Sequence, residues 1–508
     1  MMKFGLPSKV FGSGVYELVT SDQVEVNCTG YDGTTPSHWF GYKVGFRSIP
    51  KPTRTLVTPK PRPQSDPINV LIIAIDSASH NGFIRRMPKS HEVITKELKA
   101  VVLNKYNVVG DGTAAALFPL LSGKTSFEHE DYRKALSTTR LDEKLLVFHV
   151  ASTLGYRTLY FESMPWIGTF QNRHNGFSHQ PTDHYLLPLL MLQSDAGRKW
   201  WNGDKGRYCI GDTAQYALMF NLTRQFYNIK GKRFSFTFIA DISHDDFNVV
   251  TTADEELVGL LRSLKVGGKL EDTVLIVMGD HGTRYKSTRD TYQGKLEEQL
   301  PFMAIRLPLK LVNSRPDALK ALEDNANVLT TPFDIHTTLL DVLGADESRN
   351  RFTVKGSDLP RGMSLLKPIP PQRSCGEAGV VPYWCACASW RVVPAHAPQY
   401  TRAAHALLQY INNVTSTKRS LCRVRKLTYI EWVMQKISSS ERQSSDYYQA
   451  KIVTSPGYAV YEGAMRYLKE EDRYLISVND ISRITEYGHE PDCVWVVAPH
   501  LGNFCYCK

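Results

Sequence analysis

The 508-residue sequence lacks internal repeats, low-complexity tracts and any apolar run of the roughly 18 residues that a membrane-spanning helix needs. These absences exclude a repeat architecture and a largely disordered chain, and they argue against a membrane span within this sequence. Residues 1–10 have no apolar core of the kind found in signal peptides, so we expect no signal peptide here. Helix-turn-helix, zinc-finger and RNA-binding signatures are also missing, which argues against a nucleic-acid partner.

Cysteine is scarce in most of the chain, but seven of the nine cysteines follow residue 370. This clustering predicts disulfides in the C-terminal region and an oxidising compartment. A zinc site is the alternative, although the Cys385/Cys387 and Cys505/Cys507 pairs have one intervening residue instead of the usual two to four. Because the count is odd, we expect one thiol to be free or paired between chains.

Three N-glycosylation sequons begin at Asn27, Asn221 and Asn413. Together with the cysteines they favour an extracellular protein or one in the lumen of the secretory pathway. The formal net charge of +10 suits an anionic substrate, a polyanionic matrix or an acidic membrane surface. Composition is otherwise that of a globular protein, with 42% hydrophobic and 22% charged residues.

Composition changes along the chain predict four parts. Residues 1–48 alternate short apolar and polar runs and are interpreted as a small β extension. Residues 49–67 contain six prolines and are interpreted as an extended linker. Residues 68–372 form the expected core, and residues 373–508 a smaller, mixed, Cys-rich subdomain.

Strand-like and helix-like runs alternate within the expected core. The expected strands are at 69–75, 157–161, 234–239, 273–278 and 301–307. The expected helices are at 88–99, 141–154, 254–264 and 332–343, with a further helix at 400–412 and a strand-like run at 493–497. This alternation predicts an α/β fold, with right-handed βαβ units on a mainly parallel central sheet flanked by helices.

Polar side chains follow two of the apolar strands. Asp76 ends the first, and Asp280-His281 follows the run Thr-Val-Leu-Ile-Val-Met-Gly at 273–279. The carboxyl ends of parallel strands form the edge where open α/β sheets bind ligands. Carboxylate and imidazole together can hold a divalent ion such as zinc. A polar turn without a ligand is the alternative.

A glycine-rich turn leads into a short helical run that begins at Thr113. Gly110 and Gly112 permit a tight turn, and we expect Pro119 to limit the length of the helix. A helix N-terminus offers backbone N–H groups and a positive dipole end to an anionic oxygen. Thr113 as a simple helix cap is the alternative.

These motifs resemble the alkaline phosphatase superfamily, which includes sulfatases and nucleotide phosphodiesterases. They resemble most closely a sulfatase-like family of unknown function from invertebrates such as nematodes and insects. The superfamily pattern is carried by Asp76, Thr113 with the Leu-Leu-Ser-Gly run at 120–123, and Asp-His-Gly at 280–282. Further matching segments stand at 83–89, 243–248, 296–302, 329–334, 334–340 and 361–366.

The resemblance implies an alkaline phosphatase-like core and a site with one divalent metal. Asp76, Asp280 and His281 would hold the ion, with Thr113 as a further ligand and as the nucleophile. Zinc, manganese and calcium are not distinguished. The implied substrate is a phosphate ester, which would be hydrolysed or transferred through a phosphothreonine.

A second ion, or an acid/base role, is the alternative for Asp241, His244 and His336. Relatives with two metals carry an Asp followed four residues later by a His, with another His downstream. Here Asp241 precedes His244 by three residues, and His336 lies on an expected helix where a packed core histidine is more common. We therefore expect one ion.

The residues that follow Thr113 depart from the resemblance. Relatives with a threonine nucleophile continue with Phe-Pro-Asn, whereas this chain has Ala114, Ala115 and Ala116. A catalytically degenerate member that serves as an extracellular binding or matrix protein is therefore the alternative function. A sulfatase is less favoured. Sulfatases need an oxidisable Cys or Ser at the position of Thr113, a Pro two residues later and an Arg four residues later, and this chain has Ala115 and Leu117 at the last two positions. The oligomeric state is left open.

Overall fold

The structure is a computed structural model that describes residues 5–12, 14–49, 67–129, 140–171, 175–200, 208–210, 213–284, 287–345, 352–437 and 444–508. The expected linker lies outside these ranges, apart from Ile49 and Pro67. No helix in the described ranges is long and apolar enough to cross a membrane.

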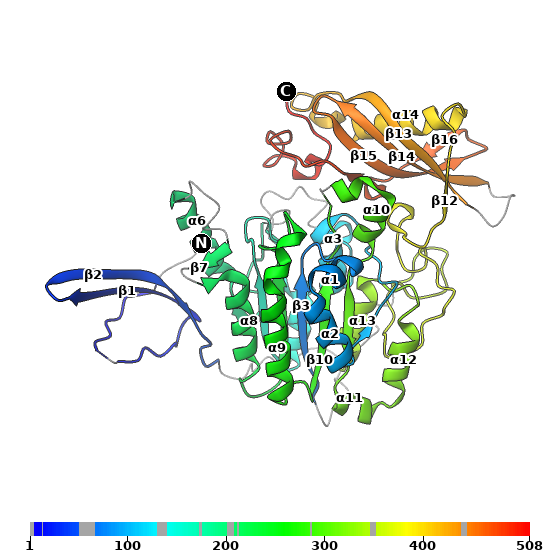
Figure 1. The fold of residues 1–508 in the computed structure, drawn as a ribbon. Helices are drawn as coiled ribbons and strands as arrows, with labels where there is room; N and C mark the ends of the chain where they lie inside the picture. The colour runs from blue at the N-terminus through cyan, green and yellow to red at the C-terminus, as the bar shows by residue number, and fades with distance from the viewer. Residues whose placement is uncertain are drawn as a thin grey trace.

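A seven-stranded sheet forms the centre of the molecule (Figure 1). Its order is β4 (Val101–Val102), β11 (Met303–Arg306), β10 (Thr273–Gly279), β3 (Asn69–Ile75), β9 (Arg233–Ile239), β5 (Arg157–Glu162) and β6 (His184–Tyr185). β3 pairs in parallel with β10 and β9, and β5 is parallel to β9 and β6, whereas β11 is antiparallel to β10. The predicted α/β class with a mainly parallel sheet is confirmed.

Helices cover both faces of this sheet, because alternate residues of each apolar strand point to opposite faces. Leu71, Ile73 and Ile75 of β3 pack with one set of helices, α1 (His80–Arg86), α2 (Pro88–Glu92), α8 (Gln215–Phe226) and α9 (Asp254–Val266). Val70, Ile72 and Ala74 pack with the other set, α3 (Gly112–Ser122), α5 (Val147–Thr153), α12 (Asp317–Asn325) and α13 (Pro332–Val342). The core therefore fills both sides of β3.

Three expected elements differ from the structure. The helix expected at 141–154 is a 3-10 turn at Glu143–Leu145 followed by α5, because Leu146 between them is extended. Pro119 does not limit α3, which continues to Ser122 with its following residues buried in the core. The run 493–497 is a series of turns closed by local hydrogen bonds, such as Ala498 N–H to the Val494 carbonyl at 2.8 Å.

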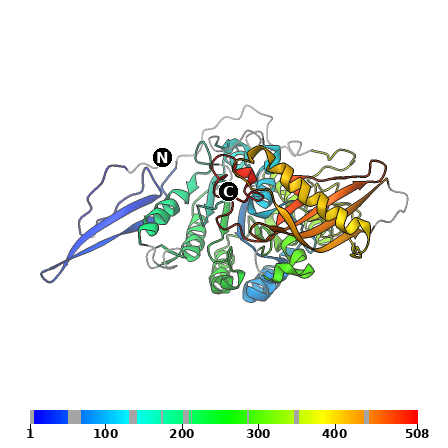
Figure 2. The ribbon, with the colours of Figure 1, turned by 90° about the horizontal axis from the view of Figure 1, so that it is seen from above.

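A second, antiparallel sheet lies above the core in Figure 1. Its order is β12 (Trp390–Val392), β13 (Lys426–Lys436), β14 (Ser445–Ser455), β15 (Ala459–Leu468) and β16 (Arg473–Leu475), and β17 (Ile481–Arg483) also pairs with β15. Figure 2 shows α14 (Pro398–Val414) running across this sheet. The apolar side of α14 packs on the sheet through residues such as Leu407 and Ile411. The boundary expected at residue 372/373 stays a prediction.

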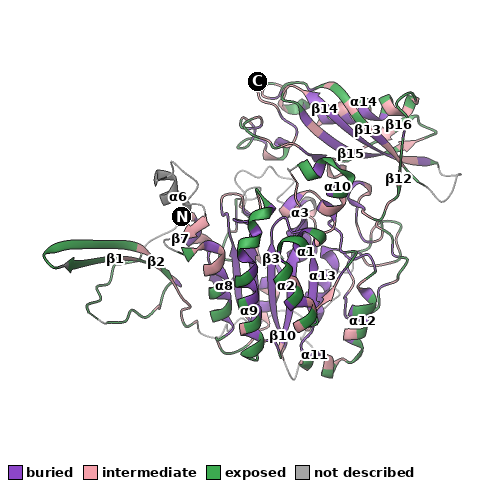
Figure 3. Cartoon of the chain, in the orientation of Figure 1, coloured by how far each residue is buried: buried purple, intermediate pink, exposed green. Residues whose placement is uncertain are grey.

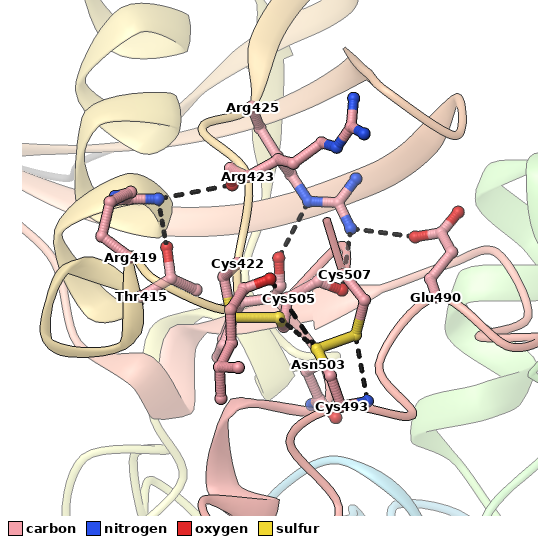
Figure 4. The surroundings of a disulfide bond; sticks show 12 residues. Thr415, Arg419, Cys422, Arg423, Arg425, Glu490, Cys493, Asn503, Cys505 and Cys507 are labelled. Carbon is pink, nitrogen blue, oxygen red and sulfur yellow. Dashed lines mark hydrogen bonds and ion pairs between the residues drawn. A yellow bond between two sulfur atoms is a disulfide. The ribbon is translucent and has the colours of Figure 1, made fainter.

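The C-terminal cysteines form three disulfides, Cys375–Cys385, Cys422–Cys505 and Cys493–Cys507. The last two are adjacent, with 4.0 Å between the Sγ atoms of Cys493 and Cys505 (Figure 4). Beside them the buried Arg425 guanidinium donates to Glu490 at 2.9 Å. The predicted disulfides are confirmed, but three cysteines are free instead of the one expected, namely Cys28, Cys209 and Cys387.

An antiparallel hairpin precedes the core. It consists of β1 (Gln23–Asp32) and β2 (Thr35–Val44), and Figure 3 shows that most of it is exposed. Asn27 lies exposed on β1, and the other two sequon asparagines, Asn221 on α8 and Asn413 on α14, are also exposed. All three are therefore accessible to a modifying enzyme.

Candidate metal centre

Asp76 and Asp280 lie side by side because their strands are in register. Ile75 pairs with Gly279 at the carboxyl ends of β3 and β10, so the next residue of each strand is an aspartate. Both side chains are buried, Asp76 at 2% exposure and Asp280 at 0%. Two carboxylates without solvent repel each other, and this arrangement calls for a cation between them.

Ser77 holds both carboxylates, and the sequence analysis missed it. Its backbone N–H donates to Asp280 Oδ1 at 3.0 Å, and its hydroxyl donates to Asp76 Oδ1 at 3.0 Å. The residue adopts φ +61°, in the left-handed region that costs a non-glycine residue about 1–3 kcal/mol. The one sign of this role in the sequence is that Ser77 directly follows an aspartate at the end of a strand.

His281 presents Nε2 to the two carboxylates. Its Nδ1 donates to the Gly282 carbonyl at 2.8 Å, which leaves the lone pair on Nε2. Nε2 lies 3.3 Å from Asp280 Oδ2 and 3.7 Å from Asp76 Oδ1. Gly282 is required at the turn, because a Cβ there would stand 2.1 Å from the Glu297 carbonyl oxygen.

Thr113 reaches the same place from the first turn of α3. Its Oγ1 lies 3.3 Å from His281 Nε2, and the residue is half-buried. The preceding Gly112 has φ +75°, which turns the chain sharply into the helix. The structure therefore brings together the four residues that the sequence analysis placed at one metal, from three separate segments of the chain.

The donor set fits a divalent metal. Asp76, Asp280 and His281 each offer a ligand atom, and these atoms lie within 4.8 Å of one another. Ligands of a tetrahedral zinc, about 2.0–2.2 Å from the ion, lie about 3.3–3.6 Å apart, close to the separations observed here. Asp280 Oδ2 is buried and accepts no hydrogen bond from the described residues. Burial, and to a smaller extent the charge of Asp76, raise the pKa of Asp280 to about 6.

Arg284 is a second residue that the sequence analysis did not single out. It follows His281 by three residues, and its Nη2 donates to Asp111 Oδ1 at 2.6 Å. Asp111 is the N-cap residue of α3, yet its side chain makes no capping hydrogen bond to the helix. A lone arginine after Asp-His-Gly gave no periodic or motif signal that could have identified it.

Asp241, His244 and His336 were the alternative residues for a second ion. Among the described residues, none of them belongs to the group of Asp76, Asp280 and His281. Asp241 is buried just beyond β9. His244 Nδ1 lies 2.6 Å from Asp245 Oδ1. Burial lowers the pKa of His244, but the hydrogen bond to Asp245 and the charge of Asp76 raise it by more. His336 is buried in α13 and donates to the Leu120 carbonyl at 3.0 Å, and burial lowers its pKa to about 4.

The alanines after Thr113 provide no polar side chain. Ala114 and Ala116 are buried at 7% and 1% exposure, packed into the first turns of α3. The buried Ala116 stands where the resemblance implies an asparagine, three residues after Thr113. This part of α3 therefore offers no side-chain hydrogen-bond donor of that kind.

The family model for "Protein of unknown function (DUF229)" matches residues 17–431. No curated protein sequence matches the chain. Among solved structures, a lipoteichoic acid synthase from Listeria monocytogenes is 14% identical over 60% of this chain and 76% of that chain, with a TM-score of 0.39. A protein of the alkaline phosphatase superfamily from Vibrio parahaemolyticus is 12% identical over 82% and 83%, with a TM-score of 0.39. A phosphonate monoester hydrolase of Agrobacterium radiobacter is 12% identical over 80% and 90%, also with a TM-score of 0.39.

Proposed function

The chain belongs to the DUF229 family, whose description assigns no activity, and we propose that it is a metal-dependent phosphoesterase or phosphotransferase with Thr113 as nucleophile. The observation that carries this proposal is the convergence of Thr113 Oγ1, at 3.3 Å from His281 Nε2, on the buried Asp76–Asp280–His281 group. A hydroxyl beside a divalent-metal ligand set is an arrangement suited to nucleophilic attack.

A divalent metal, when bound, supplies positive charge that lowers the pKa of the hydroxyl and offsets charge on the phosphate oxygens. Asp76, Asp280 and His281 would hold the ion, and Ser77 would keep the two carboxylates oriented. Zinc, manganese and calcium remain alternatives. One ion is the proposal, and Asp241, His244 and His336 are kept as candidates for a second ion or for acid/base work.

The reaction consists of two displacements at phosphorus. Thr113 Oγ1 forms a bond to phosphorus while the bond to the leaving oxygen breaks, and the leaving oxygen takes up a proton. Water, or an acceptor hydroxyl in a transfer, then attacks the phosphothreonine and restores the threonine hydroxyl. The amide N–H groups at the start of α3, which the N-cap side chain does not use, would face the oxygens that carry charge during both steps.

A phosphoryl group is favoured over a sulfuryl group. Thr113 carries no sulfur and no primary hydroxyl for oxidation to an aldehyde, and Ala115 and Leu117 replace the proline and arginine of the sulfatase motif. The substrate is therefore proposed to be a phosphomonoester, a phosphodiester or a phosphoethanolamine-type ester.

A degenerate binding or matrix protein is the second candidate, favoured by the buried alanines at 114 and 116. Loss of one oxyanion donor reduces the rate by about 100- to 1,000-fold. Such a protein would keep the fold and the metal but not the turnover.

Turnover of p-nitrophenyl phosphate and bis-p-nitrophenyl phosphate by protein loaded with zinc, manganese or calcium separates these candidates. We expect Thr113→Ala and Asp280→Ala each to reduce turnover by at least about 1,000-fold. Thr153→Ala is the matched control, because Thr153 is also a half-buried threonine, on the neighbouring helix α5. Stoichiometric metal binding without any turnover that depends on Thr113 would contradict the enzyme proposal and favour the second candidate.

The three disulfides and the exposed sequons support an extracellular or lumenal location. We propose that Asn27, Asn221 and Asn413 are glycosylated there. Intact mass before and after enzymatic removal of N-glycans, in protein from a secretory host, tests this. An unchanged mass would contradict the glycosylation.

A further inference from the structure

Arg284 lies against the start of the nucleophile helix. Its Nη1 is the atom nearest to Gly112, 2.6 Å from the point where a Cβ of that residue would stand. The side chain is 12% exposed, so the guanidinium is largely removed from solvent. A cation is therefore fixed beside the residue that directly precedes Thr113.

Two carboxylates orient the guanidinium from different directions. Nη2 donates to Asp111 Oδ1 at 2.6 Å, and Nε lies 3.6 Å from Glu298 Oε1. Glu298 is shared, because Arg289 donates to its other oxygen. Arg284 is thus held in place by two carboxylates, and a planar guanidinium so held suits the oxygens of a phosphate.

Arg284 and Thr113 are connected to the same turn. Arg284 follows His281 by three residues and lies against Gly112, whereas Thr113 Oγ1 lies 3.3 Å from His281 Nε2. A phosphoryl group bonded to Thr113 Oγ1 would carry its non-bridging oxygens into the region near this turn.

We propose that Arg284 is the anion-recognition residue of this site, contacting the non-bridging oxygens of the phosphoryl group. It would supply the positive donor that the alanines at 114–116 do not provide. This assignment rests on the proposed function, and it specifies the substrate class further as an ester with at least two anionic or acceptor oxygens on phosphorus.

Binding of inorganic phosphate to the metal-loaded protein, measured by titration calorimetry, tests the assignment without turnover. We expect Arg284→Ala to weaken phosphate binding roughly 10- to 100-fold, and Arg284→Lys to weaken it less, because lysine keeps the charge but not the fork of donors. Arg315→Ala is the matched control. Arg315 forms a two-bond pair with Asp341 at 2.9 and 3.0 Å. It directly follows α11 (Leu309–Ser314), which lies at the opposite end of the core from α3 in Figure 1.

Asp111→Asn distinguishes recognition from a purely structural role. If Arg284 binds phosphate, removing the competing carboxylate leaves phosphate affinity unchanged or increases it. If Arg284 only holds Asp111, both variants weaken binding equally, and the assignment is overturned. Unchanged affinity in Arg284→Ala, or no phosphate binding by the wild type, also overturns it. Phosphate binding that depends on Arg284 without turnover that depends on Thr113 would leave the assignment standing while the enzyme proposal fails.

Discussion

Ser77 contributes more to the site than its residue type suggests. One residue donates a backbone N–H to Asp280 and a hydroxyl to Asp76, at 3.0 Å each. It does so from a left-handed backbone conformation at φ +61°. Strain of this kind persists where the surrounding contacts demand the geometry, which is common at functional sites. Ser77 therefore fixes the positions of the two carboxylates relative to each other.

We predict that Ser77→Ala weakens metal binding about 10-fold, because groups that orient metal ligands contribute about 10- to 100-fold to affinity. The backbone N–H of residue 77 still donates to Asp280 in this variant, so we expect the loss of metal affinity to be at the lower end of that range. Competition with a chromogenic chelator measures the affinity. Ser77→Gly should lose the same affinity while relieving about 1 kcal/mol of backbone strain, visible as a higher free energy of unfolding without metal. Unchanged metal affinity in both variants would show that the hydroxyl does not orient Asp76.

At the scale of elements, α3 places Thr113 and its first-turn amides at the edge of the sheet. Its entry depends on Gly112, where a positive φ and close contact with Arg284 coincide. Its later turns are held by burial in the core, and this burial explains why Pro119 does not end the helix. A proline inside a helix removes one N–H bond and its ring crowds the carbonyl four residues earlier, and the apolar contacts of the next residues offset that cost.

Comparing Gly112→Ala with a second glycine variant should separate the effect of a close contact on phosphate affinity from the effect of backbone strain on stability. The added Cβ would stand 2.6 Å from Arg284 Nη1, so we expect the guanidinium to move and phosphate affinity to fall about 10-fold or more. Gly155→Ala is the control, because Gly155 has a similar φ of +83° and nothing within 4 Å of the added Cβ. It should cost about 1–2 kcal/mol of stability and no phosphate affinity. Equal phosphate affinities in the two variants would contradict the close-contact argument.

At the scale of the whole molecule, the C-terminal sheet is joined to the core by a buried ionic cluster. Glu462 of β15 lies 3.2 Å from both Arg289 and Lys295 of the core and accepts from Tyr383 at 2.9 Å. Burial raises the pKa of Glu462, but the charges of Arg289 and Lys295 lower it by more, to about 2. The same cluster leads through Glu298 to Arg284, so the C-terminal sheet supports the edge of the candidate site.

Glu462→Gln should destabilise the protein by about 3–5 kcal/mol at neutral pH, because it removes the paired carboxylate of the buried Lys295 and leaves the buried Arg289 with Glu298 alone. The pKa of Glu462 is depressed on folding, so its contribution to stability is present above the unfolded pKa of about 4.5 and is lost as the pH falls toward 2. The difference from the wild type should therefore shrink across that window. Denaturant unfolding at several pH values measures this, with the exposed Glu471→Gln as control. A constant difference from pH 7 to pH 3 would contradict the assignment.

Much of the fold could be predicted from the sequence. The apolar strands at 69–75, 234–239 and 273–278 have a residue pattern that buried parallel strands require, and their α/β class follows from it. The disulfide-forming cysteines were also visible from their clustering. The prediction of a strand at 493–497 was wrong, because this disulfide-linked segment forms turn hydrogen bonds despite its apolar residues.

The sequence by itself determined which residues end the strands and begin the helix, since these depend on local pattern and on turn residues. Asp76, Thr113 and Asp280-His281 were recognisable in this way. Only the tertiary structure decided that β3 and β10 are neighbours in register, that Ser77 ties their carboxylates together, and that Arg284 lies beside Thr113. These are contacts between segments far apart in the chain, set by sheet pairing and core packing, and no local pattern records them. Asp280-His281 is thus a strand end in the sequence and part of a candidate metal-binding group only in the folded chain.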